Sequence, residues 1–214
     1  QNVLAPPYGR MGRFVIGDNS VDDSIYRRSV IGSIEELDSA TLPDALAFHE
    51  AYYRPATATL IVSGNFDPAE LDRLVDQYFT EIQNPARPVP QLERKPLVRR
   101  TTPRSVVAYA PNVPLPAIAA IYQGVEASSP DAAALEILSA VMSQGGSSRL
   151  YKALVYDKQL ASAANLDADG EEEGGSIVAQ VTVAQGKSVE DAEAALNLEL
   201  DRVRNEPITA AELA

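Results

Sequence analysis

The chain has 214 residues, of which 45% are hydrophobic and 22% charged, and its formal net charge is −12. This length can bury a hydrophobic core and allows one or two domains. The acidic balance argues against a nucleic-acid-binding protein, because contacts to phosphates need a basic face. No apolar run approaches the roughly 20 residues that a membrane helix needs.

The numbers of cysteines and histidines exclude further kinds of catalytic and metal site. The chain has no cysteine, which excludes disulfides, thiolate catalysis and cysteine-ligated zinc. Its single histidine, His49, excludes a histidine-rich metal site within this chain. The start at Gln1, without Met, suggests a fragment or a processed product.

Residues 1–25 mix proline, glycine and charge without a sustained period, which is typical of loops. Asp18, Asp22 and Asp23 are candidate calcium ligands, but their spacing lacks the alternating oxygens and the glutamate of a calcium loop. We therefore interpret them as part of a solvated loop.

Residues 26–79 predict two helices, a strand and a third helix. Ser33 predicts a helical turn to Leu37, and Thr41 predicts a helix that Arg54 and Pro55 end at about Tyr53. The β-branched run 57–62 predicts a buried strand.

The third helix of this region has the clearest start signal in the chain. Asp67 is the expected N-cap, Pro68 occupies the first helical position, and Glu70 is expected to reach back to the cap. An apolar stripe facing a core is predicted from Leu71, Leu74, Val75, Tyr78 and Phe79.

Residues 86–103 are rich in proline and arginine and predict a linker between two domains. Beyond it the sequence predicts strands at 105–110, 116–122, 160–167 and 176–184. Helices are expected from Ser129–Asp131 to Gly145, from Ser147 or Ser148 to about Tyr156, from Ser188 to about Asn205, and from Thr209 onward. A weak internal repeat of strand, turn and acidic-capped helix relates residues 57–82 to residues 175–203.

Several of these motifs together resemble the insulinase/pitrilysin family of zinc metallopeptidases, which includes bacterial relatives of the mitochondrial processing peptidase. The matching segments are VIGS-x-EEL from Val30, FHEAYYRP from Phe48, ATLIVSGNFDPAEL from Ala58 and SSRLYKAL from Ser147. They occur in the family's order and spacing over about two-thirds of the chain. The resemblance implies an α+β fold of mostly antiparallel sheets flanked by helices, built from repeated α+β units.

The family's zinc site is an HxxEH helix with a downstream glutamate as third ligand. No HxxEH occurs in this chain, so the resemblance implies no catalytic residue and no metal ligand here, and zinc only in the parent protein. His49 begins a His-Glu pair, but HExxH needs a second histidine where Tyr53 stands. We interpret His49 as a surface or packing residue.

The family also carries an arginine and a tyrosine that hold the scissile carbonyl. The matching positions here are Val155 and Ser162, which cannot do that work. Tyr151, Tyr156 and Arg149 lie nearby but out of register, and we interpret them as packing or surface residues.

For two further segments we prefer a structural interpretation to a functional one. The loop Ser143–Arg149 precedes a helix and suggests a phosphate cradle, but it lacks the Lys-Ser/Thr ending of a P-loop, so we expect a tight helix-to-helix turn. The acidic run 167–173 is expected to be the solvated tip of a hairpin.

The resemblance thus predicts that residues 1–85 finish a zinc-type domain, 86–103 link, and 104–214 form most of a second, non-catalytic domain. The expected role is to complete the peptide chamber of a zinc-dependent, periplasmic endopeptidase and to dock to a partner half as a homo- or heterodimer. The expected substrate is a peptide or unfolded protein; the substrate-binding residues are unknown, and neither a nucleic-acid nor a membrane partner is expected. A catalytically inactive scaffold subunit of a peptidase-like complex, and an unrelated binding module, remain as alternatives.

Overall fold

The computed structural model describes Tyr8 and residues 32–91, 101–109, 113–172 and 174–212. They belong to two compact units. We call the unit within Val30–Arg94 the helical unit, and the one that holds the described residues after Lys95 together with Tyr8 the sheet unit. The elements are α2 (Ile34–Ser39), α3 (Leu42–Tyr52), η2 (Pro55–Thr57), α4 (Pro68–Phe79), β1 (Ala117–Gln123), α5 (Ala132–Ser143), η3 (Tyr151–Asp157), β2 (Ala161–Glu171), β3 (Gly174–Val183) and α6 (Val189–Asn205).

The helices of the helical unit begin at capping residues, as the sequence predicts. Ser33 with Glu36 and Thr41 with Asp44 form capping boxes at the starts of α2 and α3. The Asp67 carboxylate accepts from two backbone N–H groups at the start of α4. Local side-chain chemistry therefore fixes where these three helices start.

The prediction that Glu70 reaches back to the cap of α4 is wrong. Its carboxylate instead binds Arg73, with Oε1 2.7 Å from Nη2 and Oε2 2.8 Å from Nε. The arginine lowers the pKa of Glu70 and draws the side chain along the helix surface. The i,i+3 spacing on one helix face allows this pair.

The predicted buried strand at 57–62 is also not formed. Residues 55–57 form the short η2 helix, residues 58–62 have no regular structure, and the exposed fractions of Leu60, Ile61 and Val62 are 57%, 84% and 42%. A strand needs a neighbouring strand to satisfy its backbone groups, and no described segment pairs with this one. The stripe on α4 likewise finds no core here, since Tyr78 and Phe79 are exposed.

The side chain of Arg54 links the end of α3 to a later segment of the helical unit. This side chain is buried, and its Nη1 donates to the backbone oxygens of Arg87 at 2.6 Å and Pro85 at 3.4 Å. The Asn84 side chain accepts from the backbone N–H of Ala56 at 2.9 Å. These bonds attach residues 84–87, where the predicted linker starts, to the end of α3.

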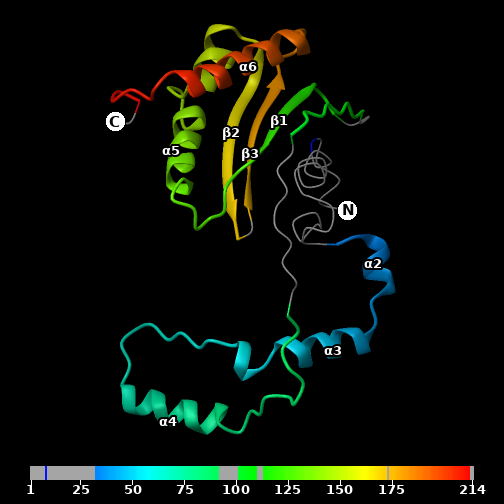
Figure 1. Cartoon of the computed structure of the whole chain (residues 1–214), viewed down its shortest axis with the longest axis vertical. Coiled ribbons are helices and arrows are strands. Elements are labelled where there is room, and N and C mark those ends of the chain that lie inside the picture. Colours follow the sequence, from blue (N-terminus) through cyan, green and yellow to red (C-terminus); the bar gives the residue numbers. More distant parts are fainter. Residues whose placement is uncertain (1–7, 9–31, 92–100, 110–112, 173, 213–214) are drawn as a thin grey trace. The chain divides into compact units, whose positions relative to one another are not determined.

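The sheet unit contains a three-stranded antiparallel sheet with the order β1-β3-β2 (Figure 1). β3 lies in the middle, with Ala120 of β1 opposite Ala179 and Leu166 of β2 opposite the same residue. The strands predicted at 116–122, 160–167 and 176–184 are confirmed. The strand predicted at 105–110 is wrong over its described residues, because residues 105–109 have no regular structure and Val107 is 74% exposed.

One face of this sheet is covered by α5, η3 and α6, and the hydrophobic core lies between the two layers (Figure 1). α6 is capped by the Ser188 hydroxyl, as predicted, and lies across the upper part of the sheet. The buried core residues are Met142, Leu150, Leu154, Ala161, Leu166, Ala179, Val181, Val183, Ala192, Ala195, Leu196 and Leu200.

The connection from α5 to η3 turns at Gly145, whose φ of +75° is the left-handed conformation that glycine adopts at helix ends. Ser148 does not cap the next helix with its side chain, because its hydroxyl donates back to the Gly145 oxygen at 2.8 Å. The following segment winds as a π-helix, in which Lys158 donates to the oxygen of Ala153. None of the described helices is both long and apolar enough to cross a membrane.

Candidate functional site

The positions where the family's carbonyl-holding pair would stand carry no such chemistry. Val155 lies on η3 and packs against the hydrophobic core. Ser162 lies on β2, and its hydroxyl donates to the backbone oxygen of Thr182 at 3.3 Å. Neither offers a cation or a phenol to a substrate carbonyl. Tyr151 and Tyr156 lie on η3 with exposed fractions of 40% and 72%, which places both at the surface.

His49 lies on the exposed surface of α3 and stacks on Tyr53, with ring centroids 4.9 Å apart and ring planes 10° apart. Tyr53 occupies the position one turn later, where a zinc helix would carry its second histidine. Within the residues that the structure describes, no three His, Cys, Asp or Glu side chains come together as metal ligands. The residues that the structure describes therefore do not fit a zinc centre.

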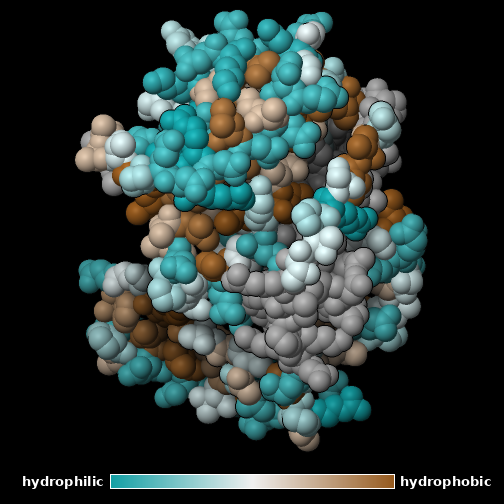
Figure 2. Space-filling model, turned by 45° about the horizontal axis from the view of Figure 1, so that its top comes forward, coloured by the Kyte–Doolittle hydropathy of each residue, from teal (hydrophilic) through white to brown (hydrophobic). Residues whose placement is uncertain are grey.

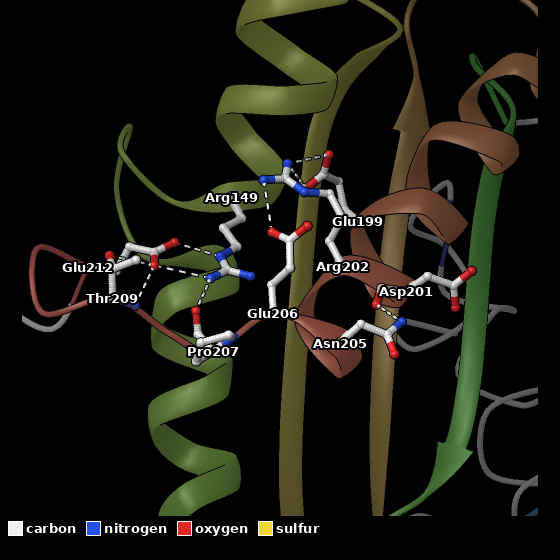
Figure 3. Close-up of polar contacts among 9 residues, drawn as sticks. All are labelled: Arg149, Glu199, Asp201, Arg202, Asn205, Glu206, Pro207, Thr209 and Glu212. Atoms are coloured by element: carbon white, nitrogen blue, oxygen red, sulfur yellow. Dashed lines mark hydrogen bonds and ion pairs between the residues drawn. The ribbon is translucent and has the colours of Figure 1, made fainter.

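The most developed polar site in the sheet unit surrounds Arg149, at the start of the helix that leads into η3 (Figure 3). The side chain of Arg149 is 11% exposed, and its Nε donates to Oε1 of Glu212 at 2.6 Å. Its Nη2 donates to Oε2 of Glu212 at 3.1 Å and lies 3.5 Å from the oxygen of Pro207. This bidentate pair fastens the segment after α6 to the turn after α5.

Glu212 is held from a second side as well. Its Oε2 accepts from both the backbone N–H and the hydroxyl of Thr209 at 2.8 Å, and its own N–H donates to the Thr209 oxygen. The Arg149 guanidinium, then the two Thr209 donors, lower the pKa of Glu212 to about 2. The helix predicted from Thr209 is present as a turn up to Glu212, the last described residue.

A second group of charges lies beside this pair at the end of α6 (Figure 3). Arg202 donates to Glu199 at 3.1 Å and to Glu206 at 3.4 Å. The negative charge of Glu199, which is buried, is the main reason why the pKa of Arg202 is raised. Both glutamates also raise the pKa of Arg149 by a smaller amount than Glu212 does. The site is an ion-pair network that orders the chain, and it holds no nucleophile.

The other two candidate segments are structural in this geometry. In the loop Ser143–Arg149, the Ser143 hydroxyl donates to the oxygen of Leu166 at 2.9 Å, so the loop is bonded to β2. The acidic run 167–173 was predicted to be the tip of a hairpin, but residues 167–171 belong to the strand β2. The strands continue this far because Gly175 has no side chain: a Cβ there would strike the backbone oxygens of Asp169 and Val125.

Neither the partners of Arg149 nor the buried position of Arg54 was predicted from the sequence. A signal for the first was present, because Thr209 and Glu212 have the spacing of a capping box. That spacing does not predict that a distant arginine also binds Glu212. Arg54 precedes a proline and was interpreted only as a helix end.

Replacing Glu212 by glutamine is expected to lower the stability of the sheet unit at neutral pH. The pKa of Glu212 lies below its usual value of 4.5, so its contribution is complete above about pH 4.5 and is lost as the pH falls through about 2. Urea denaturation at several pH values should therefore show a difference between wild type and variant that shrinks on acidification. The exposed Glu193 of α6 provides the control, Glu193→Gln. A difference that stays constant down to about pH 2 would exclude this role for Glu212.

Comparison with known proteins identifies a family for this chain. Residues 39–214 match the model of the peptidase M16 inactive domain. A zinc protease from Helicobacter pylori, PqqE, is 30% identical over 142 residues, which are 65% of this chain and 31% of that protein. This confirms the resemblance to the insulinase/pitrilysin metallopeptidases.

Solved structures share the fold. The crystal structure of a protease from Helicobacter pylori is 25% identical, with a TM-score of 0.77 over 88% of this chain and 46% of that one. The first half of the periplasmic protease PqqL from Escherichia coli is 18% identical, with a TM-score of 0.68 over 97% of this chain and 44% of that one. The chain thus spans less than half of these relatives. It belongs to the peptidase M16 family and carries the inactive domain of a zinc-protease-like protein.

Proposed function

We propose that this chain is a non-catalytic portion of a zinc-dependent endopeptidase, in which it completes the peptide chamber and docks to a partner half. The observation that carries the proposal is the pair of positions Val155 and Ser162. One packs against the core and the other bonds to its own sheet, so a reacting peptide would obtain its catalytic groups from elsewhere. The matching inactive domain and the zinc protease relative support the same role.

The helical unit supports the docking part of the proposal. None of its helices has a buried hydrophobic residue. Figure 2 shows hydrophobic residues gathered at the lower left, in the part of the chain that holds α4. Exposed apolar patches of this kind are typical of interaction surfaces. The large exposed hydrophobic residues of this unit include Leu42, Leu46, Phe48, Tyr53, Leu60, Ile61, Phe66, Tyr78, Phe79 and Ile82.

In the complete assembly, the HxxEH motif and the zinc belong to the zinc-type domain of the parent protein, and the substrates are peptides or unfolded proteins. Residues 1–85 finish the zinc-type domain, 86–103 are the linker, and 104–214 form the inactive domain. A periplasmic location is part of this proposal, since the Escherichia coli protease of the same fold is described as periplasmic.

A catalytically inactive scaffold subunit is the second candidate. The residues at Val155 and Ser162 favour it, because a chain without the carbonyl-holding pair cannot hold a substrate carbonyl; a partner that supplied the pair would remove this argument. The two roles differ in the metal content of the complete assembly. A scaffold assembly contains no zinc and cleaves no peptide, whereas a peptidase assembly does both.

The test compares zinc content and peptide hydrolysis of the complete protein, purified with any co-encoded partner, with those of this chain. A peptidase is expected to show stoichiometric zinc and chelator-sensitive cleavage in the complete protein only. A complete protein without zinc would overturn the peptidase role and leave the scaffold.

A further inference from the structure

Arg54 is the one buried residue among those that the structure describes in the helical unit, with an exposed fraction of 6%. An arginine guanidinium is always charged in a protein. A buried charge is normally paired, because the protein interior cannot solvate it as water does. The acceptors around this side chain therefore need to be identified one by one.

The backbone at Arg54 is fixed on both sides of its side chain. The residue precedes Pro55 and is extended, with φ −151° and ψ 161°, as a following proline favours. Its oxygen accepts from the backbone N–H and from the hydroxyl of Thr57, both at 3.0 Å. The guanidinium is thus attached to a backbone position that cannot easily rotate.

Only one of the three guanidinium nitrogens has acceptors among the described residues. Nη1 donates to the oxygens of Pro85 and Arg87. Nε and Nη2 are covered from solvent, and no described residue accepts from either of them. These two nitrogens form one edge of the guanidinium plane, where two parallel N–H groups match the two oxygens of a carboxylate. The edge formed by Nε and Nη2 is therefore suited to a carboxylate.

The carboxylate that is nearest in sequence does not bind this edge. Glu50 lies one helical turn before Arg54, but it is exposed and forms no ion pair with it. Bulk solvent does not reach either nitrogen, so it cannot replace the acceptor. The chain spans only 46% of the Helicobacter pylori protease, and the domain that residues 1–85 are proposed to finish continues outside this chain. That part of the parent protein is the remaining source of an acceptor.

We propose that Arg54 binds an aspartate or glutamate side chain from the part of the parent protein outside residues 1–214, and so fastens the helical unit to the rest of its domain. This rests on the proposed function, which assigns the rest of that domain to the parent protein. Through Nη1 the same side chain holds residues 85–87, where the predicted linker starts. A lysine would keep the charge but would contact only one carboxylate oxygen, because it lacks the two-donor edge.

A zero-length cross-link identifies the partner of Arg54. Arg54→Lys in the complete protein introduces a primary amine, which a carbodiimide joins to a carboxylate in direct contact. Peptide mapping by mass spectrometry is expected to find position 54 joined to an aspartate or glutamate outside residues 1–214. Arg87→Lys, at an exposed position of the same unit, measures the background of random coupling. The absence of a cross-link above this background, or a cross-link to Glu50 alone, would overturn the proposal.

Thermal denaturation tests the same contact without a cross-linker. In this chain alone, Arg54→Gln loses only the bonds of Nη1, whereas in the complete protein it also leaves a buried carboxylate unpaired. We therefore expect the melting temperature to fall at least about twice as far in the complete protein. Asn84→Ala removes the neighbouring bond to the N–H of Ala56 and should act equally in both proteins. Equal losses for Arg54→Gln in the two proteins would contradict the proposal.

The pH dependence of this excess loss distinguishes a carboxylate from a backbone oxygen. Arg54 lowers the pKa of a carboxylate that it binds, so the stabilisation is complete above about pH 4 and is lost as the pH falls below that value. The excess loss in the complete protein should therefore shrink on acidification. An excess that stays constant down to about pH 3 would indicate an uncharged acceptor and exclude the carboxylate.

These results are independent of the zinc test of the proposed function. A complete protein that holds zinc, but shows neither the cross-link nor the excess loss, would overturn this inference alone. A complete protein without zinc that shows both would overturn the peptidase role and leave the contact of Arg54 established.

Discussion

Leu196→Ala is expected to lower the free energy of unfolding of the sheet unit by about 2–5 kcal/mol. Leu196 lies in the middle of α6 and is 0% exposed. It belongs to the buried cluster between the helices and the sheet, together with Leu154 and Val181. Truncation loses the transfer free energy of the side chain and leaves a cavity that the surrounding strands cannot fill.

Thermal denaturation followed by circular dichroism measures this effect, and the expected fall in melting temperature is about 5–15 °C. Leu198→Ala is the matched control, because Leu198 lies two residues away on the same helix and is 51% exposed. Equal losses for the two variants would contradict the assignment of α6's buried face.

Gly175→Ala is expected to destabilise the sheet unit by about 3 kcal/mol, because extra atoms in a packed site force the backbone to move. A Cβ at Gly175 would meet the backbone oxygens of Asp169 and Val125, which cannot rotate away as a side chain can. A neighbouring close approach has the same origin, since a Cβ on Gly124 would lie 2.9 Å from the backbone of Gly175. Chemical denaturation should show a lower midpoint, accompanied by loss of the β2–β3 hairpin end in hydrogen exchange.

Gly146→Ala provides the comparison for this variant. The nearest atom to a Cβ at Gly146 is a ring carbon of Tyr151 at 3.8 Å, which is ordinary van der Waals contact. This substitution should change stability by less than about 1 kcal/mol. A Gly175→Ala protein as stable as Gly146→Ala would show that the strands do not approach each other as closely as described.

The sequence predicted best those elements whose signals and partners are both local. Ser188 starts α6, and Ala192, Leu196 and Leu200 recur on one face, so the start, length and buried side of this helix follow from neighbouring residues. The hairpin of β2 and β3 pairs two strands that are adjacent in sequence. Both strands were predicted shorter than they are. The glycines of the acidic turn allow the backbones to approach closely there, and composition alone does not reveal this.

The failures concern segments whose partners are distant. Residues 57–62 and 105–109 have the composition of strands, but composition cannot supply the neighbour that a strand needs. The stripe on α4 was recognised correctly as apolar, yet the helical unit offers no core to bury it. In each case the residues favour the predicted element, but the described structure contains no segment against which that element pairs or packs.

The same difference between local and distant partners applies to the candidate site. The lack of HxxEH and the residues at positions 155 and 162 could be determined from the sequence, because they depend on residue identity alone. The ion pair between Arg149 and Glu212 joins residues 63 positions apart, and no local pattern connects them. Its capping-box component at Thr209 was local and could have been recognised.

Zinc content and peptide hydrolysis of this chain alone test its non-catalytic role most directly. After equilibration with zinc and removal of the unbound metal, we expect this chain to hold no stoichiometric zinc and to cleave no unfolded substrate. The complete protein, treated in parallel, controls for the assay conditions. Stoichiometric zinc in this chain, with cleavage that a chelator abolishes and zinc restores, would contradict its non-catalytic role.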